Sequence, residues 1–261
     1  MWRGDYFSRG SRLGRLSMSG LANFAVVLFT STLLLGRSSL IQGQVAATPL
    51  GISDLPVIEV PASGPPTTLM AVILSGDGGW AGVDKRMAAS LAERGLPVVG
   101  LNSPAYLDTK RTPHGAAADL ARLLEYYLAR WHREQVILIG YSHGANLAPF
   151  MVSRLSPELR GRISLLVLLS LESHASFEFH EADIFGDITH PGDLPVLPEV
   201  EKLRGMHLLC VAGEKDKESL CPSLDHSLAR LEIRPGGHRI PSGEGKQVAD
   251  LILSRAGVPA P

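Results

Sequence analysis

The stretch QVILIGYSHGANLAPF, residues Gln135–Phe150, decides the fold. It begins as a continuous apolar run, passes through Gly-Tyr-Ser-His-Gly and continues with apolar residues at helical spacing. A serine two residues from a glycine on each side is typical of a nucleophile on a sharp turn between a strand and a helix. Chance also produces this pattern in a chain rich in glycine and serine. The rest of the sequence must therefore supply the partners that a nucleophile needs.

Length and composition indicate one main domain. The chain has 261 residues, of which 45% are hydrophobic, enough to bury one large core. Charged residues make up 20%, and 27 Gly with 18 Pro fit an α/β protein with many loops. The formal net charge is −1, and the body of the chain has no run of Lys and Arg. We therefore expect no nucleic-acid partner.

The first 47 residues differ from the rest. Four arginines precede the uncharged segment Leu21–Leu35, and a polar patch with small residues follows it. This order is typical of a secretory signal peptide, and an uncleaved N-terminal membrane anchor is the alternative. Either reading places the body of the protein in the periplasm. These residues hold five basic groups and one acidic group, so the remaining chain has a formal charge of −5.

Export changes the interpretation of the two cysteines. In an oxidising compartment, Cys210 and Cys221 are expected to form a disulfide, with two separate buried thiols as the alternative. Closing a loop of about a dozen residues stabilises the fold by roughly 3 kcal/mol in the chain-entropy model.

Beyond a Pro-rich lead-in over residues 48–68, strand-length apolar runs alternate with helical patterns. The predicted strands are Leu69–Ser75, Pro97–Leu101, Gln135–Gly140, Ser164–Ser170, Met206–Ala212 and Ala229–Arg234. Most are continuous apolar runs, as expected for parallel strands covered on both faces. The predicted helices cover residues 82–95, 112–131, 146–156 and 245–257. The alternation predicts a doubly wound, mostly parallel sheet with helices on both faces. Together with the serine turn after one of the strands, it indicates an α/β-hydrolase fold over residues 69–261 with a minimal cap.

The fold predicts partners for the serine. Ser142 lies between a strand and a helix, and in this fold the acid and the histidine follow the serine in chain order. The strand that ends near Gly213 continues into Glu214 and Asp216, and the last strand continues into His238. We predict Ser142 as nucleophile, His238 as base and Asp216 as the orienting acid, with Glu214 as the alternative acid.

The loop after the first predicted strand supplies donors for an oxyanion. ILSGDGGW, Ile73–Trp80, contains three glycines that let the backbone approach a ligand closely. The backbone N–H of Asp77 or Gly78 is expected to pair with that of His143, the residue after the nucleophile. No Gly-Lys-Ser/Thr follows this loop, which argues against a nucleotide site.

Several segments together carry a family resemblance. They are IGYSHGA, LSGDGGW, GAAADLARLLEYYLARW, FEFH, PVLPE, two cysteines with ten residues between them and RPGGH. Over roughly Leu69–Ala256 this set resembles the VirJ/AcvB proteins, exported α/β-hydrolase-fold proteins named for a bacterial virulence system. The chain is similar to the short, single-domain type. It differs from the pattern at His143, where many relatives are expected to carry an aromatic residue.

The resemblance implies a substrate. Members of the family are implicated in hydrolysing aminoacyl-phosphatidylglycerol, lysyl or alanyl, at the outer face of the inner membrane. Such an ester carries an ammonium group beside the scissile carbonyl, and the expected carboxylates for this group are Asp77 and Glu172. For each of them an ordinary structural role is the alternative. No cofactor is implied, and the histidines have no zinc-ligand spacing.

Two other functions stay open at this stage. One is a general exported esterase or lipase acting on uncharged esters. The other is a non-catalytic interaction protein of a secretion system, which would make a secretion-system protein its partner. The sequence does not indicate the oligomeric state.

Overall fold

The structure is a computed structural model that describes residues 51–181 and 189–258. The predicted signal peptide or membrane anchor over residues 1–47 lies outside the described residues. Of the helices that are described, none combines the length and the apolar character needed to span a membrane.

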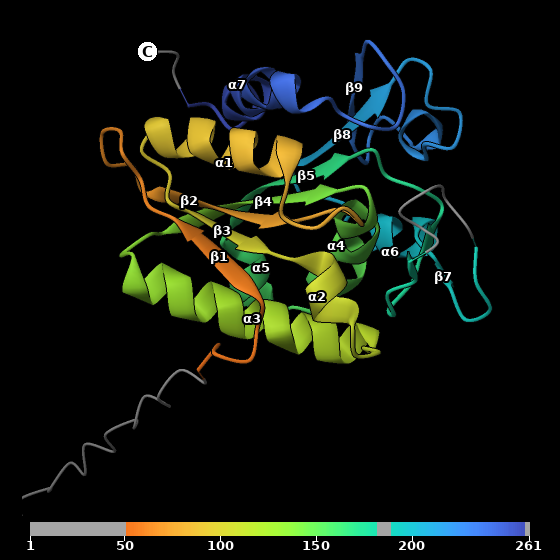
Figure 1. Ribbon diagram of the computed structural model, residues 1–261, viewed down its shortest axis with the longest axis horizontal. Coiled ribbons are helices and arrows are strands. Elements are labelled where there is room, and N and C mark those ends of the chain that lie inside the picture. The colour runs from red at the N-terminus through yellow and green to blue at the C-terminus, as the bar shows by residue number, and fades with distance from the viewer. Residues whose placement is uncertain (1–50, 182–188, 259–261) are drawn as a thin grey trace, which may run out of the picture. The chain divides into compact units, whose positions relative to one another are not determined.

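The described residues form a seven-stranded, mostly parallel sheet (Figure 1). Its order is β1-β3-β2-β4-β5-β8-β9. The bounds are β1 Val57–Val60, β2 Leu69–Leu74, β3 Val98–Leu101, β4 Gln135–Tyr141, β5 Ile163–Leu169, β8 Leu208–Gly213 and β9 Arg230–Arg234. Only β1 pairs antiparallel, at one edge beside β3, whereas the other neighbours are parallel. The carboxyl ends of the parallel strands therefore meet at one edge of the sheet, where α/β proteins bind ligands.

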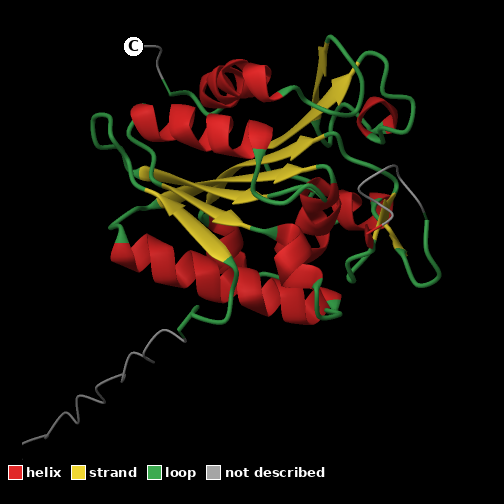
Figure 2. Ribbon diagram, viewed as in Figure 1, coloured by secondary structure: helices red, strands yellow, loops and turns green. Residues whose placement is uncertain are grey.

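Helices cover both faces of the sheet, as Figure 2 shows. One face carries α1 (Gly82–Glu93) and α7 (Gly245–Arg255). The other carries α3 (Pro113–Arg130) and α4 (His143–Ser153), with three short helices, α2 Ser103–Leu107, α5 Pro157–Gly161 and α6 Leu197–Glu201. Two separate apolar clusters, one on each side of the sheet, form the core. Both faces of the strands are thus buried, which explains why their sequences are continuously apolar.

The turn between β4 and α4 depends on two glycines. A Cβ atom at Gly140 would lie 2.4 Å from the carbonyl oxygen of Gly144, and one at Gly144 would lie 2.2 Å from the carbonyl oxygen of Leu74. Both distances are far below van der Waals contact, so no side chain fits at either position. The two glycines of the Gly-x-Ser-x-Gly pattern therefore allow the strand and the helix to approach closely around Ser142.

Helix α4 begins at His143, directly after Ser142, where the turn from strand to helix was expected. The structure differs from the sequence-based expectations in two places. Strand β1 lies in the Pro-rich lead-in, where no strand was expected. The sequence FEFHEADIF, residues 177–185, indicates a hairpin, but residues 177–181 contain no strand and residues 182–185 lie outside the described residues. Instead, the short strands β6 (His174–Ala175) and β7 (Leu194–Pro195) pair with each other.

Candidate active site

Ser142 occupies the tip of the turn between β4 and α4. Its φ of 52° and ψ of −119° are a strained conformation for a non-glycine residue, and it forms the N-cap of α4. Its backbone N–H donates to the carbonyl oxygen of Leu169 at 2.9 Å, which fixes the turn to the neighbouring strand β5. The hydroxyl lies 2.9 Å from Nε2 of His238. This is the geometry in which an imidazole takes the proton of an attacking hydroxyl.

His238 lies on the loop after β9, and several groups hold that loop. The Ser170 hydroxyl donates to the His238 carbonyl oxygen at 2.7 Å, and Arg234 Nη2 donates to the same oxygen at 3.2 Å. Two residues further on, the backbone N–H of Ile240 donates to the Tyr141 hydroxyl at 3.1 Å. Sequence reasoning did not single out these supporting residues, because they contact the loop backbone from distant strands.

Asp216 is the carboxylate that lies next to His238. Its Oδ2 atom is 3.3 Å from His238 Nδ1, and its side chain is only 2% exposed. The contact has the length of an ion pair but does not form a hydrogen bond. The alternative acid Glu214 is half exposed and lies 4.0 Å from Lys215. The structure therefore brings Ser142, His238 and Asp216 together and leaves Glu214 at the surface.

The predicted oxyanion donors lie beside the serine. A Cβ atom at Gly76 would be 3.2 Å from the Cβ of Ser142, so the loop after β2 runs directly past the nucleophile. The N–H of Gly79 closes a turn onto the carbonyl oxygen of Gly76 at 3.0 Å. Among the described backbone hydrogen bonds, none uses the N–H of Asp77, Gly78 or His143. These N–H groups are therefore available to a ligand oxygen.

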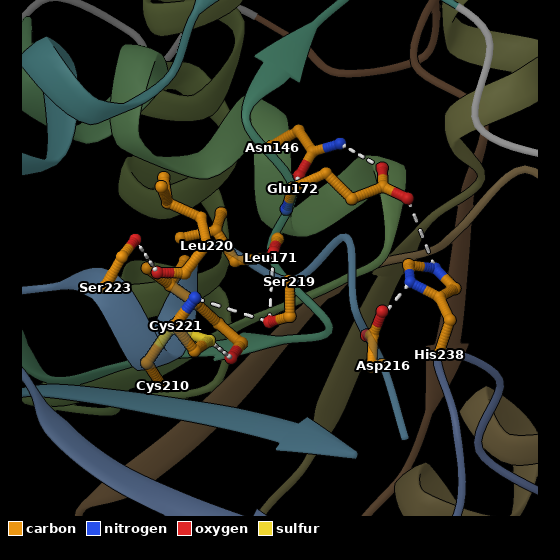
Figure 3. Close-up of a disulfide and its surroundings, with 11 residues drawn as sticks. Asn146, Leu171, Glu172, Cys210, Asp216, Ser219, Leu220, Cys221, Ser223 and His238 are labelled. Atoms are coloured by element: carbon orange, nitrogen blue, oxygen red, sulfur yellow. Dashed lines mark hydrogen bonds and ion pairs between the residues drawn. A yellow bond between two sulfur atoms is a disulfide. The ribbon is translucent and has the colours of Figure 1, made fainter. Parts of the chain in front are cut away.

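A second carboxylate reaches the histidine from the other side (Figure 3). Oε1 of Glu172 lies 3.5 Å from Nε2 of His238. Asn146 on α4 donates from Nδ2 to Glu172 Oε2 at 2.7 Å and accepts from the Glu172 backbone N–H at 2.9 Å. This double contact fixes the carboxylate, which is 7% exposed. Glu172 was expected from the sequence, but its partner Asn146 was not.

The side chain of His143 contacts two oxygen acceptors. Its Nδ1 lies 3.2 Å from Asp77 Oδ1, and its Nε2 lies 2.9 Å from the carbonyl oxygen of Ser176. Asp77 was expected as a ligand for a substrate amine, but here its carboxylate pairs with the neighbouring histidine. This pairing makes Glu172 the better-placed candidate for that role.

These residues line a cavity of about 430 Å³. Among the described residues that line it, six are acidic: Asp77, Asp84, Glu172, Asp193, Asp216 and Glu218. Arg239 is the permanently charged base in the same set, together with three histidines. The buried carboxyl of Asp84 has its pKa raised to about 7, because burial disfavours the charged form. The lining therefore favours a positively charged ligand over an anionic one.

The described residues contain no group of three or more His, Cys, Asp or Glu side chains arranged to hold a metal ion. The two cysteines form a disulfide, Cys210–Cys221, with their Cα atoms 5.5 Å apart, which confirms that prediction. The bridge joins β8 to the 3₁₀ helix at Cys221–Ser223 (Figure 3), so the chain segment that it closes includes Asp216.

A family model described as bacterial virulence protein (VirJ) matches residues 68–257. The chain belongs to the VirJ family. The predicted family resemblance is therefore confirmed. A search of the curated proteins finds no match for this VirJ protein.

Solved structures similar to this VirJ protein are α/β hydrolases. Est1E from Butyrivibrio proteoclasticus has a TM-score of 0.56 at 12% identity, covering 78% of this chain and 96% of that one. MenH from S. aureus has a TM-score of 0.56 at 14% identity, with coverages of 77% and 97%. XC6422 from Xanthomonas campestris, described as an α/β serine hydrolase without lid, has a TM-score of 0.51 at 15% identity, covering 78% of this chain and 90% of that one. At these identities the likeness shows the fold, and it confirms the α/β-hydrolase prediction.

Proposed function

We propose that this VirJ protein is a serine ester hydrolase that cleaves the aminoacyl ester of aminoacyl-phosphatidylglycerol, lysyl or alanyl. The products are phosphatidylglycerol and the free amino acid. The Ser142–His238–Asp216 arrangement supports ester hydrolysis, because it combines a hydroxyl, a base in contact with it and a buried acid on the other ring nitrogen.

In the first half of the reaction, Ser142 Oγ attacks the aminoacyl carbonyl while its proton passes to Nε2 of His238. Asp216 beside Nδ1 orients the ring and stabilises its positive charge. Backbone N–H groups of His143 and of Asp77 or Gly78 stabilise the oxyanion. The bond from the carbonyl carbon to the glycerol oxygen then breaks, and His238 returns the proton to that oxygen. Phosphatidylglycerol leaves, and the aminoacyl group stays on Ser142.

In the second half, water attacks the aminoacyl-serine ester. His238 accepts a proton from the water and passes it to Ser142 Oγ as the ester bond breaks. The free amino acid leaves, and the starting state of the three side chains is restored. No redox step or cofactor is needed for this balance.

The observation that carries the substrate proposal is the position of Glu172. The α-ammonium of an aminoacyl ester lies one carbon from the scissile carbonyl, so it must lie near the Ser142 hydroxyl when the carbonyl is attacked. Glu172 Oε1 is 3.5 Å from the same His238 nitrogen that the hydroxyl contacts. A carboxylate held in this position attracts a cation that lies close to it. An ester with an α-ammonium supplies that cation, and a neutral ester does not.

We also propose that the protein acts in the periplasm, at the outer surface of the inner membrane, where such a lipid is accessible. The N-terminal pattern and the Cys210–Cys221 disulfide support this location, because a stable disulfide is typical of an oxidising compartment. A secretion-system partner stays a prediction from the family resemblance.

The proposal is tested with purified protein and vesicles that contain lysyl- or alanyl-phosphatidylglycerol. Free amino acid is measured over time for the wild type and for Ser142→Ala, beside a short neutral ester. We expect release from the lipid that disappears in Ser142→Ala. Cleavage of the neutral ester alone would favour the general esterase, and no cleavage of any substrate by folded protein would favour the interaction protein.

A further inference from the structure

The ring of His143 lies between two groups that only accept hydrogen bonds. Nε2 is 2.9 Å from the backbone carbonyl oxygen of Ser176, which has no hydrogen to give, so Nε2 must carry one. Nδ1 is 3.2 Å from a carboxylate oxygen of Asp77, and a lone pair facing a carboxylate at this distance would be repulsive. A proton on this side of the ring removes the repulsion between Nδ1 and Asp77.

That second proton belongs to the ring. The ordinary pKa is about 3.9 for an aspartic acid and about 6.5 for a histidine, so the shared proton favours the imidazole. Because Nε2 already carries a proton, the ring is then a cation and Asp77 its counter-ion. We propose that His143 is an imidazolium and a positioning residue of the oxyanion hole. Its ring connects Asp77 and the loop at Ser176 to the Ser142 turn.

The surroundings of the ring favour this protonation state. Burial works against the charged form, but the Asp77 carboxylate, the Ser176 carbonyl and the Glu172 carboxylate together hold the pKa of His143 above its ordinary value. Asp77 lies on the loop after β2, Glu172 lies between β5 and β6, and Ser176 directly follows β6. The other titratable groups in the same cavity are Asp84, Tyr141, His174, Asp193, Asp216, Glu218, His238 and Arg239.

The pairing of these two side chains also affects the backbone groups of the same residues. His143 and Asp77 are also the residues whose backbone N–H groups are the proposed oxyanion donors, so their side-chain pair sets the distance between those donors. Oxyanion stabilisation depends on donors that are fixed before the reaction begins. This step rests on the proposed acyl-transfer chemistry, whereas the protonation state of the ring does not.

Nuclear magnetic resonance of protein with ¹⁵N-labelled histidine rings tests the protonation state directly. Two-bond ¹H–¹⁵N correlations are recorded from pH 6 to pH 9, and the His143 signals are assigned by their shift in Asp77→Asn. We expect both ring nitrogens of His143 to be protonated at pH 7.5, where exposed histidines are neutral. A neutral tautomer of His143 at pH 7.5 would overturn the proposal.

The positioning role is tested with Asp77→Asn, which keeps the shape but removes the counter-ion. We expect kcat for a short neutral ester to fall at least about tenfold at pH 8 and less at pH 6, with KM little changed. Complete removal of an oxyanion donor costs roughly 10²–10³-fold. Affinity for an alkyl boronic acid, which forms a tetrahedral adduct with the serine, should fall in parallel.

Glu214→Gln is the matched control, because it removes one carboxylate charge from a half-exposed side chain that does not line the cavity. It should change neither the pH profile nor the boronate affinity. Equal effects of the two variants would overturn the positioning role, because they would reduce it to a general effect of charge. The neutral ester and the boronate keep this test separate from the lipid proposal, and the resonance experiment needs no activity.

Discussion

Oε1 of Glu172 lies 3.5 Å from Nε2 of His238, the ring nitrogen that also contacts the Ser142 hydroxyl at 2.9 Å. Asp216 lies on the other side of the ring, beside Nδ1. The two carboxylates therefore have different surroundings, because Asp216 lies behind the histidine and Glu172 lies on the side where the substrate must bind. This asymmetry fits the orienting role proposed for Asp216 and the substrate-binding role proposed for Glu172.

Substitution of Ser142 or Asp216 should affect the catalytic rate far more than the stability of the fold. Ser142→Ala should lower kcat by several orders of magnitude, up to about 10⁶-fold, as in other serine hydrolases with this arrangement. Asp216→Asn should lower it by about 10⁴-fold, because the imidazole loses the group that fixes its tautomer. Steady-state kinetics on a soluble ester, with thermal unfolding as a check of the fold, measures both effects.

Glu214→Gln is the control for Asp216→Asn, because Glu214 lies two residues away and is half exposed. It should keep nearly full activity. A loss in Glu214→Gln as large as that in Asp216→Asn would contradict the assignment of the acid.

Reduction of the disulfide should destabilise the fold and weaken catalysis. Cys210 and Cys221 close a loop that includes Asp216, and such a loop stabilises the protein by roughly 3 kcal/mol in the chain-entropy model. The double variant Cys210→Ala, Cys221→Ala should unfold at a lower urea concentration than the wild type, and its kcat should be lower. An unchanged free energy of unfolding would show that the bridge does not constrain the chain.

Asp84 should make the protein less stable as the pH rises. Burial raises the pKa of its carboxyl from 3.8 to about 7 in the folded state, so between these values the folded protein binds the proton more tightly than the unfolded chain. The contribution of this proton to the stability of the folded state is fully present below about pH 4 and is lost as the pH rises through 7. Asp84→Asn should therefore stabilise the protein at pH 8 more than at pH 5.

Urea unfolding of the wild type and Asp84→Asn at both pH values measures this difference. The expected gain at pH 8 is on the order of a few kcal/mol. Ser223→Ala is a suitable reference, because the hydroxyl of Ser223 is exposed and bonds only to the carbonyl of Leu220 within the described contacts. If Asp84→Asn had the same effect at both pH values, the carboxyl would have an ordinary pKa.

Local sequence signals predicted most of the sheet and the position of the nucleophile. Continuous apolar runs identified β2, β3, β4, β5 and β8 to within two residues at either end, because buried parallel strands leave no polar alternation. The edge strand β9, RLEIR, alternates polar and apolar residues and was predicted equally closely. Strand β1 was missed, since VIEV is short, lies among prolines and pairs at an exposed edge. The Ser142 turn was predictable because its two glycines are required by sterics alone.

The contacts that complete the site were less predictable. Asn146 and Glu172 are 26 residues apart and meet only because α4 and the end of β5 are neighbours in the folded sheet. Ser170 supports the His238 loop across 68 residues. The pairing of His143 with Asp77 also depends on where the loop after β2 passes the Ser142 turn. Such contacts follow from tertiary structure, and no local pattern indicates them.

The central claim is that the site selects an ester with an α-ammonium group, and one measurement tests it most directly. Alanyl-phosphatidylglycerol and lactyl-phosphatidylglycerol have nearly the same shape, but the first carries an ammonium where the second has a hydroxyl. The ratio of their kcat/KM values in identical vesicles isolates the contribution of that charge. The ratio is measured for the wild type and for Glu172→Gln.

We expect the wild type to prefer the alanyl lipid by at least about tenfold, which corresponds to about 1.4 kcal/mol of transition-state stabilisation. In Glu172→Gln the ratio should fall toward one, mainly through slower cleavage of the alanyl lipid. Equal kcat/KM values for the two lipids in the wild type would contradict the account.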